Sequence, residues 1–209
     1  MLKVKKLSKI SSFSCIAILF ILNISTNAFS ESQGKKLYTA YNIWYETGKE
    51  SSLWCINYKT GNIIPAGTEV MDVSLARPVS GRFQGGSKQA IAFTAVNDGK
   101  KFYVNFKAKF HPGKTIEDYM ELMLTGKNFT QITKGLNEKE IKAIREGVIR
   151  VGMSKRAVYI SYGPPPEHKT SSQKNNAWTY WMNRFKSKRI NFDKNNRATA
   201  TPQHDPNIL

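Results

Sequence analysis

The feature that most restricts the fold is a short helix bounded at both ends, within VGMSKRAVYISYGPPPEHKT at residues 151–170. Ser154 predicts the N-cap, because its hydroxyl can accept a hydrogen bond from an unpaired backbone N–H one turn later. Gly163 suits the left-handed position that follows a helix, and Pro164 lacks the N–H that a further turn would need. The sequence therefore predicts a rigid helix of about two turns, from about Lys155 to Tyr162.

The N-terminus has the pattern of a secretory signal peptide. Lysines precede an apolar segment, FSCIAILFILNI, and Ala28 and Ser30 place small residues before a cut. We expect residues 1–30 to be removed; an uncleaved anchor is the alternative, but the apolar run is shorter than the roughly 20 residues that span a bilayer. Cys15 lies inside the apolar run and not at its end. The sequence thus predicts an exported chain without a lipid anchor.

The charge of the exported chain indicates anionic partners. Without residues 1–30 it keeps 28 basic residues against 15 acidic ones, a formal net charge of +13. Such a charge favours membrane headgroups, cell-wall polymer or acidic proteins, and export makes nucleic acid an unexpected partner. Cys55 is then the only thiol, which excludes an intramolecular disulfide and a cysteine-cluster metal site. We interpret Cys55 as a small buried hydrophobic residue.

Residues 36–110 have the pattern of an all-β module. Aromatic and β-branched residues recur between turn signals such as YETGKESS, SGRFQGGS and NDGKK. The predicted strands are LYTAYNIWY, SLWCINY, TEVMDVSL, QAIAFTAV and KFYVNFKAKF. Asp98-Gly99 predicts a hairpin between the last two strands, and the whole pattern favours a small barrel or curled sheet. The segment NYKTGNIIPAGTEV resembles part of bacterial SH3-like modules.

Beyond the β-rich half, the hydrophobic period becomes that of helices. Residues 111–136 are predicted to be a helical linker, with a helix capped by Thr115 and stopped by Gly126. The stretch NEKEIKAIREG predicts a second helix, in which Asn137 is the cap and Glu140 completes a capping box. This helix leads through VIRV to the bounded helix described above.

The segment NAWTYWMNRFKSKRINFDKNNRATAT at residues 176–201 predicts strands. Trp178 and Tyr180 alternate with Thr179 and Trp181, which is the period of a strand. We therefore expect Trp178 and Tyr180 on the core face and Trp181 on the opposite face. KSKRINF predicts a second strand, DKNN a tight turn and RATAT a third strand.

Three motifs in this order resemble the BamE/SmpA/OmlA-type domain of bacterial envelope proteins. They are Gly152-Met153-Ser154 at a helix start, Tyr162-Gly163-Pro164-Pro165 at its end and Trp178-Thr179-Tyr180 in a strand. The resemblance covers about residues 137–201 and implies a layered fold of two helices and three strands. The fold expected for the whole chain is α+β: a β-rich N-terminal module followed by this small BamE-like domain.

The resemblance also implies a function without chemistry. Proteins of this family resemble accessory subunits of the outer-membrane β-barrel assembly machinery, which contact partner proteins and anionic lipid. It implies a periplasmic or outer-membrane-associated binding component whose partners are envelope proteins, with the barrel-assembly machinery among the candidates. The alternative is a cell-wall-associated module whose SH3-like half recognises peptide or glycan.

Most of the matched residues are interpreted as determinants of shape. Those that set backbone conformation or core packing are Gly152, Met153, Ser154, Gly163, Pro165, Trp178 and Tyr180. The candidate binding residues are Trp181, Arg184, Lys186 and Lys188. Alternation within RFKSKRINF predicts that the three cations share one face and that Phe185 lies on the other. This basic face is either a solvated strand edge or a surface for anionic headgroups or wall polymer.

The sequence contains no recognisable catalytic motif. His111, His168 and His204 have no partner at a metal-binding or triad spacing. His-Glu-x-x-His, Gly-x-Ser-x-Gly and a phosphate-binding glycine loop are absent. We therefore expect no enzymatic activity, no cofactor and no metal site. The tail at residues 202–209 has two prolines and no periodicity, and it is expected to be disordered.

Overall fold

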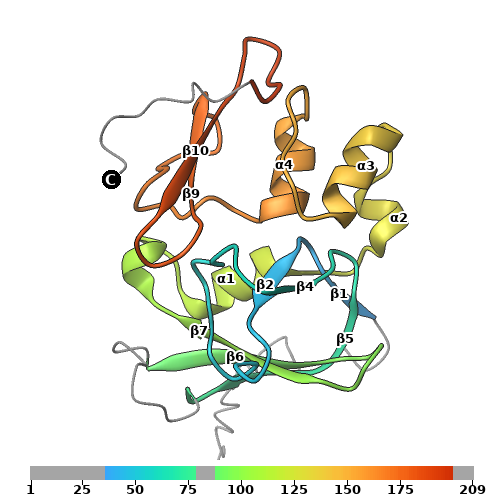
Figure 1. Cartoon of the computed structure of the whole chain (residues 1–209). Coiled ribbons are helices and arrows are strands. Elements are labelled where there is room, and N and C mark those ends of the chain that lie inside the picture. Colours follow the sequence, from blue (N-terminus) through green and yellow to red (C-terminus); the bar gives the residue numbers. More distant parts are fainter. Residues whose placement is uncertain (1–35, 79–87, 200–209) are drawn as a thin grey trace, which may run out of the picture. The chain divides into compact units, whose positions relative to one another are not determined.

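The computed structural model describes residues 36–78 and 88–199, which belong to one compact unit containing helices and strands (Figure 1). The expected α+β class is confirmed at this level. The predicted signal segment 1–30, the SGRFQGGS loop, His204 and the predicted tail 202–209 lie outside the described residues. No helix in the two described ranges is both long and apolar enough to cross a membrane.

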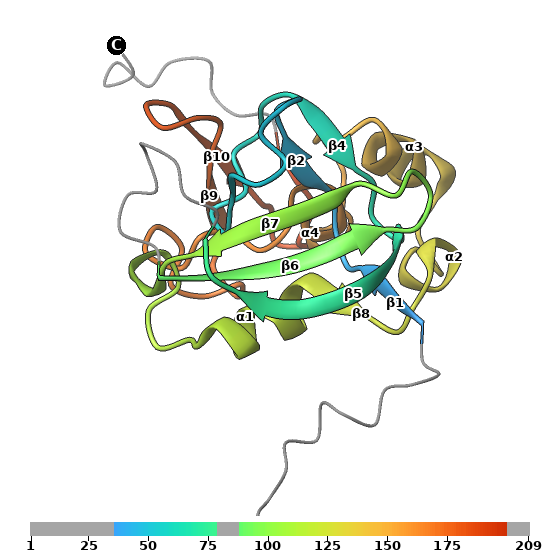
Figure 2. The same ribbon diagram turned by 90° about the horizontal axis from the view of Figure 1, so that it is seen from below.

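The larger sheet has six strands in the order β3-β7-β6-β5-β1-β8. Figure 2 shows β7, β6 and β5 side by side. Neighbouring strands are antiparallel except β3 and β7, which run parallel. The predicted β6–β7 hairpin is confirmed, and Gly99 in its turn has a φ of 68°. The bounds of the six strands are β1 Leu37–Thr39, β3 Leu53–Trp54, β5 Glu69–Ala76, β6 Gln89–Ala95, β7 Lys101–Phe106 and β8 Leu124–Thr125.

Three of the predicted strands were too long, and within SLWCINY only β3 (Leu53–Trp54) is a strand. The segment LYTAYNIWY divides into β1 and β2 (Ile43–Tyr45), and β2 pairs with β4 (Asn62–Ile64) in a separate two-stranded sheet. The chain leaves the larger sheet here because the buried Asn42 side chain donates to the Ile144 carbonyl at 2.6 Å and accepts from the Ala66 N–H at 2.7 Å. KFYVNFKAKF stops as a strand at Phe106 and continues into the 3₁₀ turn Ala108–Phe110.

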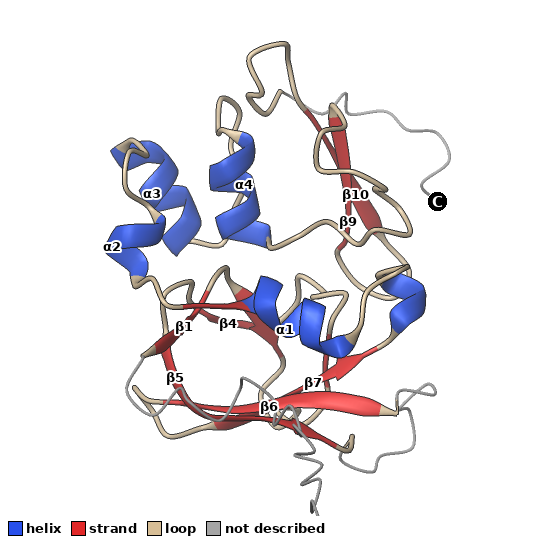
Figure 3. Cartoon of the chain, turned by 180° about the vertical axis from the view of Figure 1, so that it is seen from behind, coloured by secondary structure: helices blue, strands red, loops and turns tan. Residues whose placement is uncertain are grey.

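The predicted helix caps are confirmed, and Figure 3 shows the helices that they begin. Capping boxes begin α1 (Ile116–Met123) at Thr115 and α3 (Glu138–Arg145) at Asn137, and Ser154 caps α4 (Lys155–Tyr162). Helix α1 ends at Met123, before Gly126, because Leu124 and Thr125 pair with β1 as strand β8. The one-turn helix α2 (Phe129–Ile132) was not predicted, since a single turn carries too little periodicity to identify.

The C-terminal segment forms a hairpin of β9 (Ala177–Trp181) and β10 (Ser187–Asn191). Trp178 and Tyr180 are buried, as predicted. Of the third strand predicted at RATAT, residues 197–199 are described, and there Arg197 and Ala198 form isolated bridges, to Ser154 and Phe192, instead of a strand; the rest of RATAT lies outside the described residues. The Arg197 N–H donates to the Asp193 side chain, and the N–H and carbonyl of Ala198 bond to Met153 and Gly152, which belong to no strand.

The hydrophobic residues form two clusters. The first joins the inner face of the six-stranded sheet to α1, and the second surrounds α3, α4 and the β9–β10 hairpin. The second cluster also takes Trp44 and Ala66 from the N-terminal half, while Tyr159 packs against both clusters. The two predicted modules thus share a core, although their predicted boundaries stay predictions.

Candidate functional site

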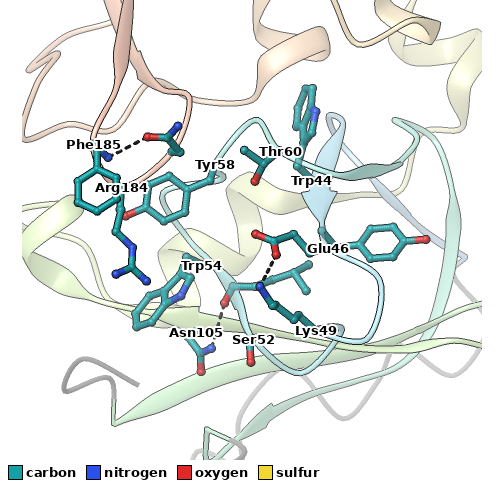
Figure 4. Close-up of a pocket in the computed structure, with 13 residues that line it drawn as sticks. Trp44, Glu46, Lys49, Ser52, Trp54, Tyr58, Thr60, Asn105, Arg184 and Phe185 are labelled. Atoms are coloured by element: carbon teal, nitrogen blue, oxygen red, sulfur yellow. Dashed lines mark hydrogen bonds and ion pairs between the residues drawn. The ribbon is translucent and has the colours of Figure 1, made fainter. Parts of the chain in front are cut away.

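A pocket of about 590 Å³ opens where the loops around β2 and β3 meet the turn between β9 and β10 (Figure 4). Most of its wall comes from the N-terminal half of the chain, and the β9–β10 turn supplies the remainder. The lining residues are Trp44, Tyr45, Glu46, Lys49, Ser52, Leu53, Trp54, Tyr58, Thr60, Asn105, Asn183, Arg184 and Phe185. Parts of the chain that are distant in sequence therefore build this site together.

Tight turns position the two rims of the pocket. On the first rim, the N–H of Lys49 donates to the Glu46 carbonyl at 2.9 Å, and Gly48 between them has a φ of 77°. On the second rim, Asn183 Oδ1 accepts from the N–H groups of Phe185 at 2.9 Å and Lys186 at 2.8 Å. This side-chain turn fixes the hairpin tip, as Asn side chains commonly do.

Aromatic rings form much of the pocket surface. The ring of Trp44 is largely buried, with 8% of the residue exposed, and it packs edge-on against Tyr162 at a centroid distance of 5.5 Å. Trp54 and Tyr58 are half-buried, whereas Phe185 is 86% exposed. Rings of this kind provide large rigid contact area, and an exposed Phe beside them marks a contact surface.

Positively charged side chains lie beside two of these rings. The guanidinium carbon of Arg184 lies 5.5 Å from the centroid of the Phe185 ring, and Nζ of Lys107 lies 5.9 Å from that of Trp54. Burial raises the pKa of Tyr58, and the positive charge of Arg184 opposes that rise. Lys49 forms a close ion pair with Glu46. The balance of charge at the pocket is therefore positive.

Lys59 lies next to Trp44 but is not among the described residues that line the pocket. Its Nζ is 4.3 Å from the Trp44 ring centroid, 5.3 Å from that of Tyr162 and 5.5 Å from that of Tyr180. The same Nζ donates to the Tyr162 carbonyl at 2.5 Å, at the C-terminal end of α4, where a helix favours a cation. Burial lowers the pKa of Lys59 well below its usual value.

The pocket is lined by aromatic, polar and charged side chains and by Leu53. Among the described residues that line the pocket there is no histidine or cysteine. No group of three or more His, Cys, Asp or Glu side chains in the described ranges could hold a metal ion. Cys55 is buried, as expected, and burial raises the pKa of its thiol to about 12, so the thiolate nucleophile is suppressed.

The two described histidines lie outside the pocket. His111 is fully buried between the rings of Phe106 and Tyr119, and burial lowers its pKa. His168 accepts a hydrogen bond at Nε2 from the Trp181 indole N–H at 3.2 Å, and the two rings stack with centroids 6.3 Å apart. Both histidines therefore have packing roles.

The structure brings one of the four predicted binding residues to the pocket. Arg184 lines it, Lys186 and Lys188 are exposed outside it, and Trp181 is half-buried against His168. The predicted alternation from Arg184 to Lys188 is wrong, because β10 begins only at Ser187 and the residues before it form the turn. Lys188 pairs with Tyr180, so it lies on the sheet face that carries the core.

Sequence reasoning missed the aromatic wall. Trp44, Trp54 and Tyr58 were placed in predicted strands, where aromatic residues are ordinary sheet formers. The available signals were the density of aromatic residues in NIWYETGKESSLWCINY and the single aromatic residue Phe185 among the cations of RFKSK. Neither shows that the two segments meet, because that depends on long-range packing.

Comparison with protein-family models, with curated proteins and with solved structures finds no match to this chain.

Proposed function

We propose that this chain is an exported, non-catalytic binding component of the bacterial cell envelope, and that it holds a segment of a protein partner in the aromatic pocket. The observation that carries the proposal is Phe185, 86% exposed at the tip of a hairpin and next to the half-buried rings of Trp54 and Tyr58. Burying such rings on a partner is favourable, and aromatic and Arg side chains are common interface anchors.

The polar groups of the pocket favour a protein over a glycan. Sugar recognition needs free amide and carboxylate groups to bond hydroxyls, but several of these are already engaged here. Asn105 Nδ2 donates to the Leu53 carbonyl at 3.0 Å, Asn183 Oδ1 accepts two backbone N–H groups, and Glu46 is paired with Lys49. Oδ1 of Asn105 is buried without a hydrogen-bond partner among the described residues, and the rings and Arg184 are the groups that a partner can reach.

The resemblance supports a place in envelope assembly. The β9–β10 turn belongs to the segment that resembles BamE-type domains, and it contributes Arg184 and Phe185 to the pocket. The proposed partners are accordingly envelope proteins, with the barrel-assembly machinery as the leading candidate.

A wall-associated module remains the second candidate. Ten of the thirteen lining residues lie at positions 44–105, within the β-rich half for which the SH3-like resemblance was noted. Under this proposal the same pocket would recognise peptide or glycan of the wall.

In-cell photocrosslinking tests the proposal. A photoreactive amino acid at Phe185 should capture a protein, whereas the same amino acid at Val151, which is 71% exposed and does not line the pocket, should not. Tyr58→Ala in the Phe185-labelled chain should reduce the capture. Crosslinks to barrel-assembly subunits support assembly, and crosslinks to wall material support the second candidate. Equal labelling from both positions would refute a pocket-based function.

Deleting one half of the chain is a poor test. The second core contains residues of both halves, so either deletion would expose buried apolar surface and unfold the remainder. Single substitutions of exposed or half-buried pocket residues avoid this difficulty.

A further inference from the structure

We infer that the pocket selects an extended, acidic peptide segment, with a carboxylate beside an apolar or aromatic side chain. The inference rests on the proposed function and names the chemistry of the partner that the pocket would accept.

The first support is that cations stand next to ring faces without acidic partners. Arg184 lies against Phe185, and Lys107 lies against Trp54. Within the described part of the chain, neither cation forms an ion pair with a carboxylate. A guanidinium binds a carboxylate through two parallel hydrogen bonds, while the neighbouring ring offers a surface to an apolar side chain.

The second support is the balance of charge around the pocket. Glu46 is the only carboxylate among the described lining residues, and its ion pair with Lys49 offsets it. Lys186 and Lys188 follow Arg184 on the hairpin, and neither makes an ion pair to a described carboxylate. An acidic segment entering beside Phe185 would therefore meet positive potential at the tip and along the strand that follows.

The third support is the shape of the site, which distinguishes a peptide from a membrane surface. The volume of about 590 Å³ can hold a few side chains. Trp44 forms part of its wall while only 8% exposed, so a flat layer of headgroups would touch Phe185 but would not reach that ring. An extended chain can insert alternate side chains into such a recess.

Peptide selection on the purified full chain tests this inference. A display library of random 12-residue peptides would be selected on the chain, on Arg184→Gln and on Phe185→Ser. We expect peptides with Asp or Glu next to Pro or an aromatic residue to be enriched on the unaltered chain. On Arg184→Gln the acidic preference should be lost, while apolar positions are still selected.

A titration then measures the effect of charge. An enriched peptide and its copy with every Glu or Asp changed to Gln or Asn would be compared by tryptophan fluorescence, because Trp44 and Trp54 line the site. The acidic peptide should bind about tenfold more tightly, and this advantage should fall as salt is raised. Arg184→Gln should abolish the advantage. Lys174→Gln, which removes a cation that does not line the pocket, should retain it.

Each outcome separates the two proposals. Enrichment of apolar peptides without acidic residues would overturn the inference about charge and leave a peptide-binding function in place. Equal recovery on the chain and on Phe185→Ser would overturn both. Binding of anionic lipid vesicles that Phe185→Ser abolishes, without peptide enrichment, would assign the tip to a membrane surface and overturn the inference.

Discussion

Gly163 is constrained both by its own backbone and by its neighbours. Its φ is 79°, and a Cβ atom at this position would lie 2.7 Å from Cδ2 of the Tyr41 ring. Tyr41 cannot yield easily, since it is buried and its hydroxyl donates to that of Tyr119 at 3.0 Å. We expect Gly163→Ala to lower the free energy of unfolding by about 3 kcal/mol, measured by urea denaturation.

Gly152 is the matched control. Its φ is 86°, but a Cβ atom would meet nothing within 4 Å. Gly152→Ala should therefore carry only the backbone cost, about 1 kcal/mol. If the two alanine variants were equally stable, the close approach of Tyr41 to the end of α4 would not matter energetically.

Lys59 should give the protein an alkaline dependence of stability. Burial lowers its folded-state pKa below the usual 10.5, so between the two values the unfolded chain binds more protons. The free energy of unfolding then rises with pH across this window and becomes flat above it. We expect the stability of the unaltered chain relative to Lys59→Met to increase as the pH rises toward 10.5 and to become constant above it, measured by urea denaturation.

At neutral pH the same substitution should leave stability unchanged or raise it. A methionine of similar length can pack against the rings of Trp44, Tyr162 and Tyr180, and replacing buried ionic groups by well-packed apolar ones is often neutral or stabilising by about 1–4 kcal/mol. A pH-independent difference between the two proteins would show that the Lys59 amine does not titrate differently in the folded chain.

For single residues, the sequence predicted those conformations and hydrogen bonds that depend on residues nearby in the chain. The caps at Ser154, Asn137 and Thr115 and the left-handed Gly163 follow from residue types at fixed offsets. The three aromatic rings around Lys59 could not be predicted to meet there. The most distant of them in the sequence, Tyr180, is 121 positions from Lys59.

Among the elements, α3 and α4 are tied together by one carboxylate. Glu140 is 5% exposed, and its Oε1 accepts from the Ser154 N–H at 2.8 Å and from Nη1 of Arg197 at 3.0 Å. Its Oε2 accepts from the Asn137 N–H at 3.2 Å. Burial alone would raise the pKa of Glu140, but these hydrogen bonds outweigh it and hold the pKa below its usual value.

We expect Glu140→Ala to destabilise the protein by about 1–3 kcal/mol, because it leaves part-buried donors such as the Ser154 N–H without their partner. The contribution of Glu140 is present above its unfolded pKa and is lost as the pH falls through its lowered folded pKa. Thermal denaturation as a function of pH should therefore show the unaltered chain converging on the variant in acid. Asp118→Asn is the control, because it changes the corresponding exposed capping box of α1. If this variant lost as much stability as Glu140→Ala, the bonds of Glu140 to Ser154 and Arg197 would not be the cause of the loss.

Helices were predicted more accurately than strands. Both partners of a capping box lie within one turn, so Glu140 was identified as a capping residue, while its bonds to Ser154 and Arg197 were not. The break between β1 and β2 was missed because it depends on Asn42 reaching Ile144, 102 positions away. Hydrophobic alternation alone does not say where a strand changes partner.

For the whole molecule, buried asparagines connect the two halves. Asn42 bonds to Ile144 and Ala66, and Asn57 Nδ2 donates to the carbonyls of Asn42 at 3.0 Å and Tyr162 at 3.2 Å. These bonds and the shared core predict one cooperative unfolding transition for the described part of the chain.

Asn42→Ala should destabilise both halves together, by about 3 kcal/mol, because a buried carbonyl and a buried N–H lose their partner. Calorimetry should show a single transition at a lower midpoint. Asn62→Ala, which removes an exposed bond to Thr47, should stay within about 0.5 kcal/mol of the unaltered protein. Two resolved transitions would instead mean that the predicted modules unfold separately.

The division of the chain into a β-rich half and a helical half followed from its changing period, but their interlocking did not. Nor did the candidate site, which needs Trp54 and Arg184 to meet across 130 positions. Long-range hydrogen bonds such as that from Asn57 to the Tyr162 carbonyl cannot be recognised in the sequence, because asparagine is also a common turn residue.

The position of β1 restricts the order in which the fold can be completed. This strand lies between β5 and β8, with Leu37 opposite Val70 and Thr39 opposite Leu124. A chain that emerges N-terminus first would present β1 early, yet one of its two flanking strands appears only after another 85 residues. Pairing between segments so far apart in the sequence slows folding, and until β8 has been made one edge of β1 is open to incorrect pairing. The first strand of the sheet to be made is therefore among the last to be enclosed.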